Sequence, residues 1–142
     1  MVIISQLTTL LGCGIYFIVT GKVPEQLILL WSCIGLFLSV PFMVVGSNTL
    51  AFLIFYGIAT LFLAIVNNSV PVAVIQIADY SIMGQYSSGR LLVHAVGSSL
   101  SGIICIALIR LIGVFPTMLL TGGMFLVCGF CYYGYMKKNG LR

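Results

Sequence analysis

Three side-chain amides, those of Asn67, Asn68 and Gln76, are the first candidates for chemistry, because they interrupt a long apolar stretch. Amides at membrane depth need polar partners that lipid cannot supply, so they should face other helices or a water-filled cavity. Helical spacing places Asn68 and Gln76 near one face and turns Asn67 about 100° away from Asn68. Two interpretations stay open: contact with a substrate in a cavity, and hydrogen bonding between helices without a substrate.

Two charged residues, Asp79 and Arg90, flank the only substantial polar segment, residues 80–89, which is predicted to be a loop. A charge at the bilayer centre costs about 2.5 to 3.5 kcal/mol on insertion scales, so both are expected close to water. One interpretation is that they only mark the water boundary. The functional hypothesis is a cytoplasmic gate, in which Asp79 pairs with Arg90 or Lys22 and separates when the helices rearrange.

The single histidine, His94, is expected one turn inside the cytoplasmic end of the helix that follows this loop. Because imidazole titrates near neutral pH, His94 could relay protons. The alternative is that it only contacts lipid headgroups or loop water.

Small residues recur at four-residue spacing in the same segment. The pairs are Ala95/Ser99, Gly97/Ser101 and Ser98/Gly102. Since small residues let helix backbones approach closely in lipid, this face is predicted to pack against another helix, with a substrate path along it as the alternative. Gly12 and Gly14, and likewise Gly122 and Gly123, are interpreted in the same way.

The sequence contains one Cys-x-x-Cys pair, Cys128 and Cys131. A membrane thiol oxidoreductase would need such a pair near water, normally with a second pair to relay electrons, so we interpret these residues as two buried thiols. Paired carboxylates, a His-x-x-x-His motif, a glycine-rich phosphate loop and a nucleophile elbow are missing from the sequence. We therefore predict no enzyme activity, no catalytic residue, no metal site and no cofactor.

The composition indicates whether these residues lie in a water-soluble protein or in a membrane protein. Of the 142 residues, 61% are hydrophobic and 6% are charged, against a usual charged share of about 25%. A soluble enzyme, a nucleic-acid-binding module and a disordered chain are excluded, because each needs a polar or charged surface. The six basic residues form no dense patch, so no nucleic-acid partner is predicted.

Charge-free stretches predict an all-α, polytopic transmembrane bundle. Because about 20 apolar residues cross a bilayer as a helix, residues 26–78 must cross twice, divided at the turn formers of residues 46–49. A bend is expected at Pro71. One transmembrane domain over residues 1–142 is predicted, with five helices near residues 2–20, 26–45, 50–78, 91–112 and 115–136.

The basic residues predict the orientation of this bundle. Five crossings place Lys22, Arg90 and a basic tail (Lys137, Lys138 and Arg142) on one side, and Arg110 on the other. By the positive-inside bias, the first side is cytoplasmic. We therefore expect a multi-pass protein of the cell membrane with its N-terminus outside and its C-terminus in the cytoplasm.

Four motifs together resemble the tenth and eleventh helices of major facilitator superfamily transporters. They are Asn67-Asn68-Ser69-Val70-Pro71, Ile77-Ala78-Asp79-Tyr80-Ser81, Gly89-Arg90 and Val96-Gly97-Ser98-Ser99-Leu100-Ser101-Gly102. The layout of the chain resembles helices eight to twelve of that family. The resemblance implies a secondary transporter of a small molecule, similar to proton-coupled efflux proteins. It also implies that Asn67, Asn68 and Gln76 contact the substrate cavity, and that Asp79 and Arg90 act in cytoplasmic gating.

The size of the chain bears on its partners. Alternating access in this superfamily rocks two halves against each other, and each half has three plus three helices. Five helices make up less than one half, so we expect other transporter helices or a partner half as partners of this chain. Membrane lipid and a small-molecule substrate are the other expected partners. The alternative is a small accessory membrane subunit with no transport activity of its own.

Overall fold

A computed structural model of the chain describes residues 2–45, 48–77 and 83–138, without the side chains of residues 73, 74, 76, 77 and 83. Its helices are α1 (Val2–Val19), α2 (Glu25–Val45), α3 (Thr49–Ile77), α4 (Met83–Ile112) and α5 (Val114–Lys138). All five are long and apolar enough to cross a membrane, and the described residues contain no strand. The predicted all-α bundle is confirmed, and the chain has the helices of a multi-pass membrane protein.

Local signals end and begin these helices where the apolar runs break. Gly21 and Gly113 both have φ of 90°, a left-handed conformation that glycine adopts without a side-chain clash. The amide of Gly113 closes α4 by donating to the carbonyl of Ile109 at 3.0 Å. At the start of α3, the side chain of Asn48 accepts from the amide of Leu50 at 3.2 Å.

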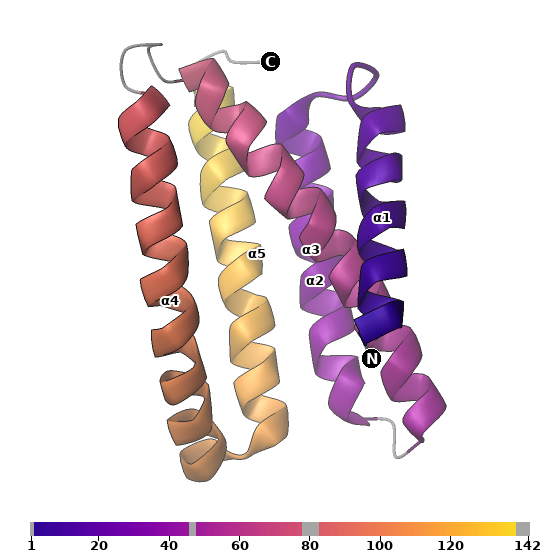
Figure 1. Cartoon of the computed structure of the whole chain (residues 1–142). Helices are drawn as coiled ribbons and strands as arrows, with labels where there is room; N and C mark the ends of the chain where they lie inside the picture. Colours follow the sequence, from indigo (N-terminus) through magenta and orange to yellow (C-terminus); the bar gives the residue numbers. More distant parts are fainter. Residues whose placement is uncertain (1, 46–47, 78–82, 139–142) are drawn as a thin grey trace.

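The helices pack unequally (Figure 1). Helix α2 packs against both α3 and α5, α1 packs against α3, and α4 makes its main contacts with α5. The buried cluster of Tyr16, Ile28 and Ile65 joins α1, α2 and α3. No described side chain of α4 is buried. Four helices thus form the packed part of the bundle, and α4 stands at its edge.

Glycines permit the closest helix contacts. A Cβ atom added to Gly12 would lie 2.7 Å from the carbonyl oxygen of Leu61, and one added to Gly129 would lie 2.8 Å from the Cβ of Cys33. Among the described residues, no atom lies within 4 Å of a Cβ added to Gly14 or Gly123. A Cβ added to Gly122 would lie 3.3 Å from backbone atoms of Phe37, so the predicted packing role holds for Gly12 and Gly122 but not for Gly14 and Gly123.

The start of α4 differs from the sequence prediction. Residues 83–89 were predicted as part of a loop, but they belong to the first two turns of α4, which begins at Met83 and not near residue 91. The hydroxyl of Ser88 donates to the carbonyls of Gly84 at 3.0 Å and Gln85 at 3.1 Å. Polar side chains that suggest a loop by composition are thus satisfied within a helix.

The small residues of α4 also differ from their predicted role. Among the described residues, nothing lies within 4 Å of a Cβ added to Gly97 or Gly102. The hydroxyls of Ser98, Ser99 and Ser101 donate to carbonyls of their own helix. This face was predicted to pack, but no described helix packs against its two glycines, and α4 makes its main contacts with α5.

Candidate functional site

The two adjacent asparagines of α3 have different environments. The Asn68 side-chain amide donates to the Cys13 sulfur at 3.2 Å and to the Ala64 carbonyl at 2.8 Å. Asn68 therefore joins α1 to α3, as the interhelical interpretation predicts. Asn67 is exposed, and its backbone carbonyl accepts a hydrogen bond from the Arg90 guanidinium at 3.4 Å. Neither asparagine lines a cavity described below.

The predicted gate is only partly within the described residues. Asp79 lies outside them, as does the side chain of Gln76, so their roles stay predictions. Lys22 is exposed in the α1–α2 turn and lines a cavity of about 430 Å³. Arg90 lines a different cavity on α4. The structure does not bring Lys22 and Arg90 to one site.

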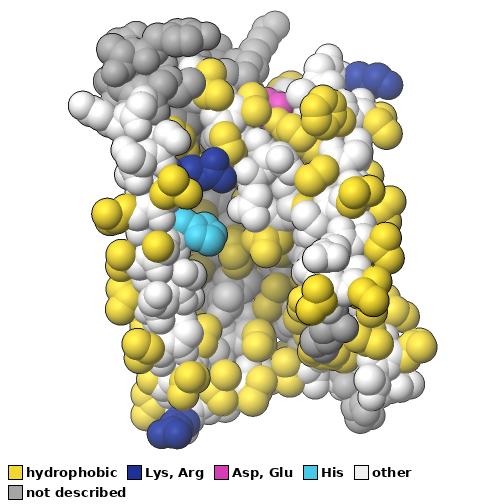
Figure 2. All heavy atoms as spheres, viewed as in Figure 1, with side chains coloured by type: hydrophobic (Ala, Val, Ile, Leu, Met, Phe, Trp, Pro, Cys, Tyr) yellow, Lys and Arg dark blue, Asp and Glu magenta, His cyan; other side chains and the backbone are white. Residues whose placement is uncertain are grey.

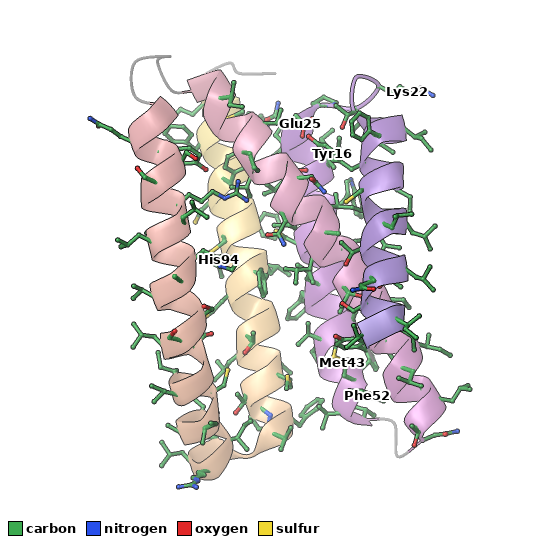
Figure 3. The ribbon with its side chains drawn as sticks, in the orientation of Figure 1. Tyr16, Lys22, Glu25, Met43, Phe52 and His94 are labelled. Carbon is green, nitrogen blue, oxygen red and sulfur yellow. The ribbon has the colours of Figure 1, made fainter. Side chains whose placement is uncertain are left out.

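A hollow of about 480 Å³ lies beside α4 (Figure 2). Its lining residues are Tyr86, Gly89, Arg90, Val93 and His94. Figure 3 shows His94 on the side of α4 that faces α5.

Because α4 starts at Met83, the two ionisable groups in this hollow lie farther from the start of the helix than predicted. Arg90 lies about 10 Å and His94 about 16 Å along the helix from Met83. The expected position of His94, one turn inside its helix, is therefore wrong, because three turns precede it. Both side chains belong to a segment, Gly84–Ile112, that is long and apolar enough to span a membrane.

Glu25 is a candidate that the sequence interpretation missed. It is the first residue of α2, and only 7% of its surface is exposed. Its Oε1 accepts a hydrogen bond from the Tyr16 hydroxyl at 3.1 Å, whereas Oε2 has no hydrogen-bond partner among the described residues. One signal could have found it: Glu25 is one of only two acidic residues in the chain.

Polar groups from two further helices interact with Tyr16 or with Glu25. The Ser69 hydroxyl is fully buried on α3 and lies close enough to Tyr16 to interact with it electrostatically. The Tyr132 hydroxyl on α5 interacts electrostatically with Glu25. Neither hydroxyl has a hydrogen-bond partner among the described residues. Helices α1, α2, α3 and α5 thus each contribute an oxygen-bearing side chain to one region, which we call the Glu25 cluster.

The charges separate between the two ends of the bundle. Helix α1 ends, α4 begins and α5 ends at the same end (Figure 1), which carries Lys22, Arg90, Lys137 and Lys138. Arg110 lies at the opposite end, in the last turn of α4. This distribution is the one used to predict the orientation.

The cysteine pair of α5 is not buried. Cys128 and Cys131 are free thiols on the exposed surface of α5, so the prediction of two buried thiols is wrong. The reason is the packing face of α5, which follows a seven-residue spacing through its buried residues Gly122, Gly129 and Met136. In the described part of the chain, no three His, Cys, Asp or Glu side chains gather as a metal site.

Comparison with protein families, curated proteins and solved structures finds no match for this chain. The resemblance to the major facilitator superfamily therefore stands on the sequence motifs alone. A functional proposal has to come from the hollow beside α4 and from the Glu25 cluster.

Proposed function

We propose that this chain is the C-terminal part of a secondary active transporter, which moves a small molecule by alternating access and couples efflux to protons. The observation that carries the proposal is the hollow beside α4, where Arg90 and His94 lie within a segment that is long and apolar enough to span a membrane. Ionisable side chains are costly inside a membrane, and where they occur they usually line the path of a substrate or a proton.

The lining of the hollow suits a small organic molecule. Its volume of about 480 Å³ falls within the roughly 300 to 1,000 Å³ of small-molecule sites. Tyr86 and Val93 offer apolar surface, and the Arg90 guanidinium offers several hydrogen-bond donors. On this proposal Arg90 holds an acceptor group of the substrate, and His94 carries the coupled proton.

The loose attachment of α4 supports alternating access. No described side chain of α4 is buried, and a hydrogen bond from Arg90 to the Asn67 carbonyl ties α4 to α3 near the basic end. A helix with few packed contacts can shift relative to the others at low cost. Asp79, Arg90 and Lys22 would then close the cytoplasmic end.

The open face of α4 supports an assembly with further helices. Gly97 and Gly102 allow close helix approach, but no described residue occupies that space. We propose that other transporter helices or a partner half cover it. The basic end of the bundle is then cytoplasmic by the positive-inside bias, with the N-terminus outside and the protein in the cell membrane.

Proton movement in everted membrane vesicles tests this function. The vesicles come from cells that express the chain from its own locus, with the neighbouring reading frames intact. A pH-sensitive dye reports protons leaving acidified vesicles after addition of ethidium, a cationic probe, or fluorescein, an anionic probe. We expect at least one probe to release protons, and Arg90→Gln or His94→Gln to reduce that rate more than tenfold.

The matched control is Arg110→Gln, at the opposite end of α4 and away from the hollow. This variant should keep the rate of the parent. The proposal is wrong if neither probe moves protons, or if Arg90→Gln and His94→Gln behave as the parent does.

A second candidate function is a structural subunit without transport activity. It is favoured by polar groups that join helices, as in the 2.6 Å hydrogen bond between the Thr8 and Thr60 hydroxyls and the contact of Asn68 with Cys13. Under this alternative, variants of Arg90 and His94 leave every probe flux unchanged. Substitutions on the small-residue face of α4, such as Gly97→Leu, would instead release the chain from its membrane partner.

A further inference from the structure

The Glu25 carboxylate is buried without a compensating charge. It is 93% shielded from solvent, and no lysine or arginine among the described residues forms an ion pair with it. The Tyr16 hydroxyl satisfies Oε1 at 3.1 Å, which leaves Oε2 without a hydrogen bond. Because an uncompensated buried charge costs several kcal/mol, this site is electrostatically incomplete as it stands.

The surrounding groups are oxygen atoms from several helices. Ser69 and Tyr132 supply hydroxyls that have no hydrogen-bond partner among the described residues. The Tyr16 side chain interacts with both Ser69 and Glu25. Hard cations prefer such oxygen ligands. Oxygens held about 2.4 Å from a cation stand about 3.4 Å from one another, which is too far for a good O–H···O hydrogen bond. Oxygen atoms that lie close together without hydrogen bonds between them are therefore expected at a cation site.

A cavity connects this carboxylate to the aqueous end of the bundle. Glu25 lines the cavity of about 430 Å³ together with residues of the α1–α2 turn and Val72 of α3. The turn residues from Thr20 to Pro24 are exposed. The cavity holds roughly 14 water volumes of about 30 Å³ each, so an ion could enter and keep part of its hydration shell.

The position of Glu25 favours the binding of a cation. It is the first residue of α2, and the positive end of the helix dipole stabilises negative charge there. The single negative charge of the Glu25 carboxylate is balanced by a cation that carries one positive charge. The titratable or charged groups near Glu25 are Tyr16 on α1, Tyr132 on α5, and Lys22, a residue that lines the same cavity without forming an ion pair among the described residues.

We propose that the Glu25 cluster binds a small monovalent metal cation, sodium or potassium. Glu25 Oε2 supplies the charge, and the Ser69 hydroxyl, with water from the cavity, supplies further oxygen ligands. Tyr16 positions the carboxylate through its bond to Oε1. Lys22 opposes cation entry by charge repulsion. The site is separate from the hollow beside α4, and its existence does not depend on the transport function.

Thermal unfolding of the full chain, purified in detergent, tests this site. Helicity is followed in sodium, potassium or choline chloride at equal ionic strength and fixed pH. Choline is the control because it is too large for direct coordination by these oxygens. In sodium or potassium chloride we expect a higher midpoint, since a cation at 100 times its Kd shifts the folding equilibrium about 100-fold. Glu25→Gln should remove the difference between the salts.

Two further variants keep the test decisive. Lys22→Gln removes the opposing charge and should lower the Kd of the cation. Ser69→Ala should raise that Kd, and this variant still tests the site if Glu25→Gln does not fold. Equal midpoints in all three salts would overturn the proposal, as would a salt effect that persists in Glu25→Gln. A midpoint that depends on pH alone would assign a proton to Glu25 instead. None of these measurements involves transport, so failure here leaves the proposed function standing.

Discussion

Replacing Gly12 with alanine perturbs the contact between α1 and α3 at its tightest backbone approach. The new Cβ would lie 2.7 Å from the Leu61 carbonyl oxygen and 3.0 Å from the Ala64 Cβ, where ordinary contact begins near 3.4 Å. A backbone oxygen cannot rotate away, so α1 must move outward by about 0.7 Å. That shift also stretches the 3.2 Å contact between Asn68 and the sulfur of Cys13.

The magnitude follows from comparison with Gly14→Ala in the same helix. Both substitutions gain up to about 1 kcal/mol from better helix propensity, but no described atom lies within 4 Å of the Gly14 position. The difference between the two variants isolates the steric cost. For overpacking of this kind we expect about 1 to 3 kcal/mol of lost stability in Gly12→Ala relative to Gly14→Ala.

The assay is reversible unfolding of the purified chain in mixed micelles, titrated with a denaturing detergent and followed by helicity. Gly12→Ala should unfold at a lower fraction of denaturing detergent than Gly14→Ala. If the two variants unfold together, α1 does not approach α3 as closely as described. In that case the contact between Asn68 and Cys13 also fails, since the same helix pair forms it.

Three further predictions use the same unfolding assay. Gly122→Ala should be less stable than Gly123→Ala, by less than the Gly12 effect, because its Cβ would stand 3.3 Å from α2 backbone atoms while the neighbouring site is open. Asn68→Leu removes two hydrogen bonds and should lower the free energy of unfolding by about 0.5 to 1.5 kcal/mol. The loss should be smaller in a Cys13→Ala background, and an equal loss there would contradict the contact between Asn68 and Cys13. Thr60→Val should lose about 0.6 kcal/mol with its 2.6 Å bond to α1, and unchanged stability would contradict that bond.

The five helices were predictable because each is a charge-free apolar run of bilayer-spanning length. Their ends lie close to the predicted ones where a clear signal exists, such as Gly113 after α4 or Asn48 before α3. The start of α4 was not predictable from composition. Residues 83–90 are mostly polar and rich in serine and glycine, yet the Ser88 hydroxyl bonds to its own helix and the helix continues.

The sites depend on how the helices cross, which one sequence does not reveal. Glu25 follows a turn and a proline at the start of α2, and nothing in that local sequence predicts its burial. Its burial comes from Tyr16, nine residues earlier, and from side chains of α3 and α5. The same crossing decides that Gly12 packs while Gly14 does not. Conversely, Asn68 was found by the simple rule that an amide in lipid needs a partner, and it has one.

Labelling of single cysteines in intact cells tests most directly that the chain is a membrane bundle with its basic end in the cytoplasm. Lys22→Cys and Arg110→Cys are placed in a variant without native cysteines, and each is exposed to a membrane-impermeant maleimide. Lys22 lies in the α1–α2 turn and Arg110 in the last turn of α4, at opposite ends of the bundle (Figure 1). We predict that Arg110→Cys reacts in intact cells and that Lys22→Cys reacts only after the cells are opened. Equal labelling of both positions in intact cells, or the reverse pattern, would contradict this orientation.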